Sequence, residues 1–339
     1  MTLSRRAFAS LLGTGAVVIT AGGLKAAAPS NGIVRLSANE NPYGPSPAAI
    51  AAMRDAFAVA GRYPDDEADL LIADVARLHG VSSDAVLLGD GSSEILKLAA
   101  AAFTSPSRKL VMASPTFEAI ARYAGVAGAD VVTVPLDDRY AHDAAKMSAV
   151  ANAGVIYVCN PNNPTGSITP AAALRSLIES ANPSAMILVD EAYHHYATSA
   201  GYESVVPLVK AHPNLIVART FSKIYGMAGL RAGYAVAQAD VVRKLGAQQA
   251  WDSMNVMALV AARASLADTA YVADGRRRNA ATKKELLARL EALGFHTVPS
   301  ETNFVMIDLR REVRRSSARC ASGACTSAAS SRPCRNTCA

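Results

Sequence analysis

Charge is scarce in this chain, and its positive excess is confined to one end. Of the 339 residues, 18% are charged and 51% are hydrophobic, a balance that excludes a disordered, highly charged polymer and allows a large buried core. The net charge of +6 equals the seven arginines less the one glutamate of residues 310–339. The rest of the chain is therefore neutral overall, which argues against a nucleic-acid-binding face.

Cysteines are also few outside that end. Cys159 is alone in the body of the chain, and the other four cysteines lie between residues 320 and 338. Their spacing fits no zinc-ligand pattern, and no histidine stands near them. We therefore predict neither a metal site nor a disulfide framework.

Residues 1–29 are typical of an export signal. Arg5 and Arg6 precede a moderately apolar run over residues 7–24, as in a twin-arginine signal. We expect the folded protein to be exported to the periplasm, whereas a chance arginine pair would leave it in the cytoplasm. Serine and threonine interrupt the run, so we expect no stable membrane anchor.

The middle of the chain alternates between short apolar strands and helices. We predict strands near 86–89, 109–113, 131–135, 154–159, 186–190, 215–219 and 232–236, with helices that include 93–103, 116–124, 170–181 and 240–250. This alternation predicts an α/β fold with a mostly parallel central sheet flanked by helices. Helices at 47–58 and 67–79 precede it, and helices at 256–267 and 270–293 and a strand at 303–308 follow it.

The change of pattern after Trp251 predicts a second, smaller α/β domain. We assign residues 59–250 to the large domain. Residues 30–58 together with residues 251–309 form the small domain in this interpretation.

Polar residues follow several of these strands, where sites in parallel sheets are found. Residues 89–94 form a glycine-rich turn that opens a helix and suits a phosphate, although Ser92 or Ser93 also fits an ordinary N-cap. Asp190 ends an apolar strand and needs a buried partner, unless it caps a helix. Phe117 follows another strand and is suited either to stacking on a flat ring or to the core.

Lys223 stands in a small polar turn between two apolar runs. A lysine that forms an imine must be fixed and half sheltered, so that its amine can be neutral. Ser222 precedes it by one residue and Arg231 follows it by eight, and both suit one phosphate. Taken alone, the pattern is more typical of a surface lysine and arginine beside a turn.

Together these motifs resemble the fold-type I pyridoxal-5'-phosphate (PLP) aminotransferases of class I and II, most of all the histidinol-phosphate aminotransferase branch, over about residues 39–306. The resemblance implies the fold-type I PLP transferase fold. It also implies that Lys223 bonds covalently to the cofactor and that Asp190 pairs with the protonated ring nitrogen. Asn163 and Tyr193 match residues that share the 3'-oxygen of PLP.

The resemblance extends to the remaining contacts. Phosphate binding is implied for Ser92, Ser93, Ser222 and Arg231, and ring stacking for Phe117. Tyr63 matches a tyrosine that reaches the cofactor of the neighbouring subunit, which implies a homodimer. Asn39 and Tyr43 lie in the segment that covers the substrate in this branch.

The reaction implied is transamination between an amino donor and 2-oxoglutarate. The donor is an amino-alcohol phosphate like histidinol phosphate, or an aromatic amino acid. Lys223 would move a proton from the substrate Cα to C4' of the cofactor. Two alternatives stay open: decarboxylation of a phosphorylated amino acid, and a truncated, catalytically impaired protein.

Residues 310–339 depart from the family pattern. They are rich in arginine, serine, alanine and cysteine and have no apolar period. The possible codons, read one base on, permit a segment that resembles the missing end of the family. We interpret this tail as the product of a shifted reading frame, so its arginines are not assigned to the substrate carboxylate.

Overall fold

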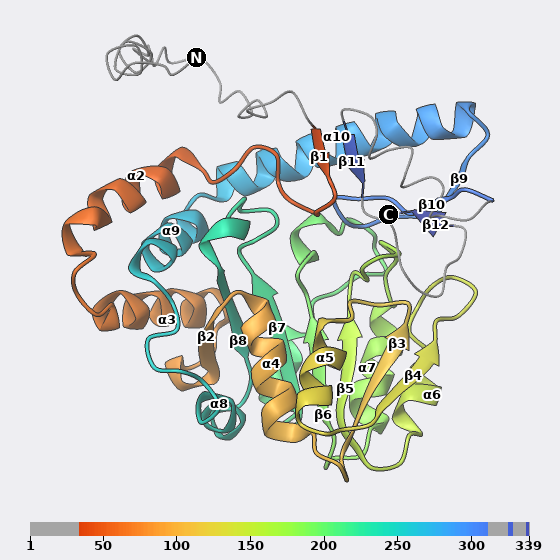
Figure 1. Ribbon diagram of the computed structural model, residues 1–339, viewed down its shortest axis with the longest axis horizontal. Helices are drawn as coiled ribbons and strands as arrows, with labels where there is room; N and C mark the ends of the chain where they lie inside the picture. Colours follow the sequence, from red (N-terminus) through yellow and green to blue (C-terminus); the bar gives the residue numbers. More distant parts are fainter. Residues whose placement is uncertain (1–33, 311–324, 328–336, 339) are drawn as a thin grey trace, which may run out of the picture.

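A seven-stranded sheet forms the centre of the computed structural model, which describes residues 34–310, 325–327 and 337–338 (Figure 1). The strand order is β2-β8-β7-β6-β5-β3-β4. β8 runs antiparallel to both of its neighbours, and the other pairs are parallel. The predicted mostly parallel sheet is confirmed. The strands are β2 (Val86–Asp90), β3 (Lys109–Ser114), β4 (Val131–Pro135), β5 (Ala153–Cys159), β6 (Met186–Asp190), β7 (Leu215–Thr220) and β8 (Ala232–Val236).

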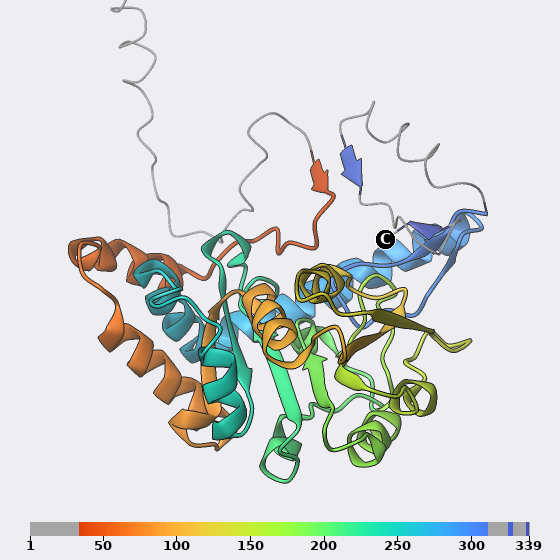
Figure 2. The same ribbon diagram turned by 60° about the horizontal axis from the view of Figure 1, so that its bottom comes forward.

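Helices cover both faces of this sheet (Figures 1 and 2). One face packs against α4 (Ser92–Phe103), α5 (Ala119–Val126) and α8 (Ala239–Gly246). The other packs against α3 (Asp65–His79), α6 (Ala144–Ser148) and α7 (Ala171–Ser180). Every residue of β5, β6, β7 and β8 is buried, as expected for strands that are apolar on both sides.

Three further helices lie beside the sheet. α2 (Pro47–Ala56) continues into a short 3-10 turn (Phe57–Val59) and packs against α9 (Val256–Ala267). Ser46 caps α2, its Oγ accepting a hydrogen bond from the Ala49 N–H over 3.2 Å. α10 (Thr269–Ala292) follows. Among the described helices none alone is long and apolar enough to cross a membrane, and only α9 with α10, bent by 80°, pass that test together.

Three predicted boundaries were wrong, in each case because side-chain hydrogen bonds hold the backbone in a different conformation. The helix predicted at 240–250 ends at Gly246, where Gln249 turns back to donate to the Leu88 carbonyl over 2.8 Å. The helix predicted at 116–124 begins at Ala119, since Thr116 is tied to Asn162 over 2.6 Å. The strand predicted at 303–308 is reduced to two residues, because side chains just before it bond to the Phe304 carbonyl.

Short strands complete the described chain. β10 (Ile307–Asp308) pairs with β9 (His296–Thr297) and with β12 (Thr337–Cys338), and β1 (Val34–Leu36) pairs with β11 (Cys325–Ser327). The predicted signal over residues 1–29 lies outside the described residues, and so does most of the tail over residues 310–339. The two-domain division stays a prediction.

Candidate active site

A cavity of about 210 Å³ opens where the carboxyl ends of β5, β6 and β7 meet the start of α4. Ligand sites of open α/β sheets lie at this edge. Ten of the residues predicted from sequence line it, and they come from segments far apart in the chain. They are Asn39, Ser92, Ser93, Phe117, Asn163, Asp190, Tyr193, Ser222, Lys223 and Arg231.

Two predicted site residues do not line this cavity. The side chain of Tyr63 is 81% exposed in the loop before α3. Tyr43 is half-buried, and the Arg278 guanidinium lies over its ring, 4.8 Å from the centroid. The substrate contact predicted for Tyr43 and the contact across a subunit boundary predicted for Tyr63 stay predictions.

Asp190 ends β6 with 2% of its surface exposed. Its Oδ1 accepts a hydrogen bond from the Ala192 N–H over 3.1 Å, and its Oδ2 accepts one from the Tyr157 hydroxyl over 3.1 Å. Burial raises the pKa of Asp190 to about 6, against the opposing effect of these hydrogen bonds and of Lys223. The carboxylate is ionised at neutral pH but is held in a costly position, which a cationic partner would relieve.

Lys223 lines the same cavity from the turn after β7. Its Nζ donates a hydrogen bond to the Asn39 carbonyl over 3.0 Å and lies 5.3 Å from the centre of the Tyr193 ring. Burial lowers the pKa of Lys223, while the charge of Asp190 opposes that shift. A lowered pKa increases the fraction of neutral amine, the form that attacks a carbonyl carbon.

One end of the cavity is built to receive an anion. α4 begins at Ser92, directly after Gly91 with φ at 73°. A side chain at Gly91 would overlap the Arg231 guanidinium, so only glycine lets that cation approach the helix start. Arg231 Nη1 also lies 3.4 Å from the Ser222 Oγ. A helix N-terminus, a guanidinium and a hydroxyl together favour a phosphate.

The opposite end is walled by aromatic and amide groups. Tyr193 is buried, accepts a hydrogen bond on its hydroxyl from Asn39 Nδ2 over 3.0 Å, and meets the edge of Phe304 at 5.2 Å between ring centres. Burial raises the pKa of Tyr193, so the phenol stays protonated. Asn39 therefore contacts Lys223 with its carbonyl and Tyr193 with its side chain, and ties the N-terminal segment to both.

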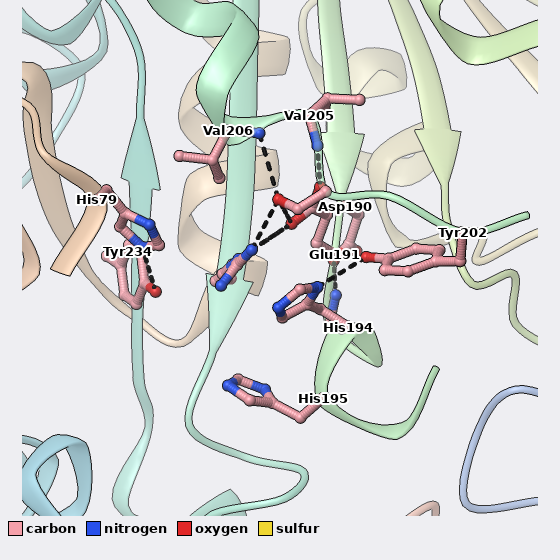
Figure 3. A network of polar contacts seen from close by, with 12 residues as sticks. His79, Asp190, Glu191, His194, His195, Tyr202, Val205, Val206 and Tyr234 are labelled. Atoms are coloured by element: carbon pink, nitrogen blue, oxygen red, sulfur yellow. Dashed lines mark hydrogen bonds and ion pairs between the residues drawn. The ribbon is translucent and has the colours of Figure 1, made fainter. Parts of the chain in front are cut away.

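Glu191, which follows Asp190 directly, belongs to a separate polar network beyond the end of β6 (Figure 3). Glu191 forms an ion pair with Arg219 over 2.7 Å, with side chains 1% and 8% exposed. Ser204 Oγ and the Val205 N–H also donate to Glu191, each over 2.8 Å. The pair ties the end of β6 to the end of β7, the two strands that lead to Asp190 and Lys223.

Two half-buried histidines lie near this network, and each contacts a tyrosine hydroxyl. His79 Nε2 lies 3.0 Å from the Tyr234 hydroxyl, and His194 Nδ1 lies 3.0 Å from that of Tyr202 (Figure 3). Burial lowers the pKa of His79 to about 4 and that of His194 to about 3. Both rings are therefore neutral at physiological pH.

Sequence reasoning missed Tyr157 and the Glu191–Arg219 pair. Alternation places Tyr157 on the same face as the residue that closes its strand, but its contact also depends on the neighbouring strand, which the sequence pattern does not identify. The ion pair joins charges 28 positions apart at the ends of two adjacent apolar strands. Two buried charges of opposite sign at neighbouring strand ends are expected to pair.

The chemistry of this cavity matches PLP feature by feature. PLP carries an aldehyde, a basic ring nitrogen, an oxygen beside the aldehyde, a flat ring and a phosphate. Groups of matching chemistry line the cavity, in that order: Lys223, Asp190, Asn163 with Tyr193, Phe117, and Ser222 with Arg231. Fold and site together define a PLP-dependent enzyme of fold type I.

Comparison with known proteins agrees. The family model for aminotransferase class I and II matches residues 31–329, beyond the end of the resemblance placed at residue 306. The histidinol-phosphate aminotransferase of Moorella thermoacetica is 39% identical over 285 residues, which cover 83% of this chain and 74% of that relative. The chain belongs to the aminotransferase class I and II family, and is a PLP-dependent enzyme of transaminase type.

Solved structures give the same fold. A structure from Erwinia carotovora atroseptica, provisionally assigned as a histidinol-phosphate aminotransferase, has a TM-score of 0.88 at 35% identity and covers 92% of each chain. The histidinol-phosphate aminotransferase of Sinorhizobium meliloti, in complex with pyridoxal-5'-phosphate, has a TM-score of 0.79 at 29% identity, covering 85% of this chain and 78% of that one. The predicted fold class and cofactor are confirmed.

Proposed function

We propose that this enzyme transfers an amino group from a phosphorylated amino alcohol like histidinol phosphate, or from an aromatic amino acid, to 2-oxoglutarate. One observation carries the proposal: a half-buried lysine amine and a buried carboxylate line one cavity beneath the N-terminal segment that includes Asn39. The relatives named above are aminotransferases, and we place transamination ahead of decarboxylation for that reason.

Lys223 and Asp190 divide the chemical work in this proposal. PLP, when bound, supplies an electron sink for the negative charge that develops at the substrate Cα. Asp190 would pair with the protonated ring nitrogen, and its burial would strengthen that ion pair. Lys223, as a neutral amine, would act as the base that takes the proton from the substrate Cα and as the acid that returns it. The Asn39 carbonyl holds the lysine amine on the side of the N-terminal segment.

The other residues predicted for the site bind and orient, whether they line the cavity or, like Tyr43, lie outside it. We assign the phosphate of PLP to Ser92, Ser93, Ser222 and Arg231, at the start of α4. Asn163 and Tyr193 hold the 3'-oxygen, and Phe117 covers the ring. Asn39 and Tyr43 contact the substrate.

A second copy of the chain completes the site in this proposal. Tyr63 is 81% exposed, and Phe57 in the adjoining 3-10 turn is 70% exposed. Such large apolar side chains at one bend of the chain favour burial against another subunit. Sedimentation velocity, with Tyr63→Ala assayed for cofactor affinity, tests the homodimer and the shared site together.

Export through the twin-arginine route is the proposed localisation. The proposal rests on Arg5, Arg6 and the run that follows them. Cell fractionation of the full chain and of a variant with both arginines changed to lysine tests it, because the exported fraction should disappear in the variant. A variant that stayed periplasmic would contradict the signal.

Resequencing codons 309–316 tests the shifted reading frame of the tail.

The reaction is tested by a donor screen. Histidinol phosphate, phenylalanine and tyrosine are each incubated with the PLP-loaded protein and 2-oxoglutarate, and glutamate is measured. We expect glutamate with histidinol phosphate or with the aromatic donors. Release of CO₂ from a phosphorylated amino acid, without glutamate, would favour the decarboxylase instead.

Lys223→Ala should abolish both turnover and the absorbing species that borohydride traps on the protein. The loss should be at least about 10⁴-fold, since the base and the covalent anchor are removed together. Lys283→Ala is the matched control, because that half-buried lysine donates to the Thr302 carbonyl away from the cavity. Full transamination by Lys223→Ala would refute the proposed function.

A further inference from the structure

Tyr157 is a buried tyrosine to which the proposed reaction gives no role. It lies within β5, two residues before the strand ends at Cys159, and its exposed fraction is 0%. Its hydroxyl donates a hydrogen bond to Oδ2 of Asp190 over 3.1 Å. This deeply buried hydroxyl therefore contacts the carboxylate that is proposed to pair with the ring nitrogen of PLP.

The sheet register explains how this contact forms. β5 and β6 are parallel neighbours, with Tyr157 opposite Leu188 and Cys159 opposite Asp190. Side chains alternate between faces along a strand, so Tyr157 and Asp190 lie on the same face as diagonal neighbours. A tyrosine side chain is long enough to reach a diagonal neighbour on the adjacent strand, as its hydrogen bond to Asp190 shows, whereas a serine or threonine is much shorter.

The carboxylate of Asp190 is held from two sides. The Ala192 N–H donates to Oδ1, and the Tyr157 hydroxyl donates to Oδ2. An ionised carboxylate has about four acceptor positions, so acceptors remain for the cavity that Asp190 also lines. One donor per oxygen fixes the plane of the group, whereas the Ala192 N–H alone would leave it free to rotate about its last bond.

We propose that Tyr157 is a positioning residue, whose hydroxyl fixes the Asp190 carboxylate in the orientation that meets the ring nitrogen of PLP. The proposal rests on the function proposed for Asp190 and goes beyond it. Burial raises the pKa of Tyr157 well above its ordinary value, so the hydroxyl remains a donor at physiological pH. Hydrogen bonding from Tyr157 lowers the pKa of Asp190 and opposes burial, which raises it to about 6.

The other titratable groups around Asp190 are known. Cys159 faces it from β5, Glu191 and Tyr193 follow it in the chain, and Lys223 faces it from the segment after β7. Lys223 lowers the pKa of Asp190 through its charge, and Glu191 raises it. The Tyr157 contribution is separated from these by removing one oxygen atom and nothing else.

The first experiment measures Asp190 directly in the cofactor-free protein. The pKa of Asp190 is followed by NMR of protein labelled with ¹³C at the aspartate carboxyl carbon, with Asp190→Asn to identify the signal. Tyr157→Phe should raise that pKa by about one unit, a tenfold weaker acid, because a hydrogen bond to the charged form is lost. Tyr202→Phe is the control, since its hydroxyl contacts His194 and not Asp190.

The second experiment measures cofactor affinity as a function of pH. Affinity should fall on the acid side as Asp190 takes up a proton, and Tyr157→Phe should move this acid limb about one pH unit upward, the same shift as above. Tyr202→Phe should leave the limb in place. The proposal would be overturned if the acid limb of the affinity curve lay at the same pH in Tyr157→Phe as in the wild type. It would also be overturned if the limb moved equally in the control, even if thermal stability fell.

A variant expected to shift the Asp190 pKa in the opposite direction provides the test if Tyr157→Phe does not fold. Site-specific 3-fluorotyrosine at position 157 keeps the shape and makes the phenol a stronger donor, so the Asp190 pKa should fall. An unchanged or higher pKa would refute the positioning role. The NMR measurement needs no cofactor, so wild-type protein that binds no PLP would reject the proposed function separately from the Tyr157 contact.

Discussion

Asp190 and Glu191 are consecutive acidic residues, each 2% exposed, yet their surroundings differ. Glu191 is satisfied within the protein by a guanidinium, a hydroxyl and a backbone N–H (Figure 3). Asp190 has two neutral donors and faces a cavity with its remaining acceptors. Burial alone therefore does not identify a reactive group, because a carboxylate whose partners are all internal has nothing left to offer a ligand.

Asp190→Asn should produce the larger change in activity. Transamination should fall by roughly 10²- to 10³-fold, since a preorganised charge aimed at the reacting system is lost. The measurement is kcat for the best donor with saturating PLP. Glu191→Gln changes the neighbouring residue without changing its shape, and should retain most of the activity per amount of folded protein. Equal losses of activity in the two variants would contradict the difference between Asp190 and Glu191.

Glu191→Ala should produce the larger change in stability. Removing one partner of a buried ion pair leaves Arg219 charged and unpaired, at a cost of about 3–5 kcal/mol in the free energy of unfolding. Urea unfolding of the cofactor-free protein measures it. Glu203→Ala is the control, because Glu203 pairs with Arg175 over 3.0 Å with side chains 60% and 47% exposed. That exposed pair should contribute at most about 1 kcal/mol, and a loss as large as that of Glu191→Ala would argue against the burial effect.

Asp190→Asn should stabilise the cofactor-free protein at alkaline pH. The pKa of Asp190 is raised from 3.8 to about 6 on folding, so its ionisation costs stability as pH rises through that interval. A shift of about two units corresponds to about 3 kcal/mol, which the asparagine variant regains at pH 8. Below pH 4 the difference between variant and wild type should vanish. Unfolding curves at pH 4, 6 and 8 test this. A variant less stable than the wild type at pH 8 would contradict the claim that ionised Asp190 destabilises the cofactor-free protein.

The sequence predicted both carriers of the proposed chemistry because each follows a strand whose apolar run is unmistakable. Lys223 and Asp190 were placed correctly at the sheet edge, and the register then brought them to one cavity. Tyr157 escaped because its contact depends on β5 lying beside β6, a fact of strand order that no local pattern carries. The double contact of Asn39 also joins segments 154 and 184 positions away, beyond what turn chemistry predicts.

The close fit between the N-terminal segment and the lysine turn sets an order of assembly. Gly226 lies so near the Gly44 carbonyl that any side chain at 226 would overlap it, and Asn41 Nδ2 donates to the Ile224 carbonyl over 2.8 Å. Residues 39–44 are synthesised early. Nearly two hundred further residues must follow before the segment around residues 224–226, against which they pack, has been made. The wall of the cavity therefore closes only after synthesis has passed residue 226, and a nascent chain released before that point carries no finished pocket.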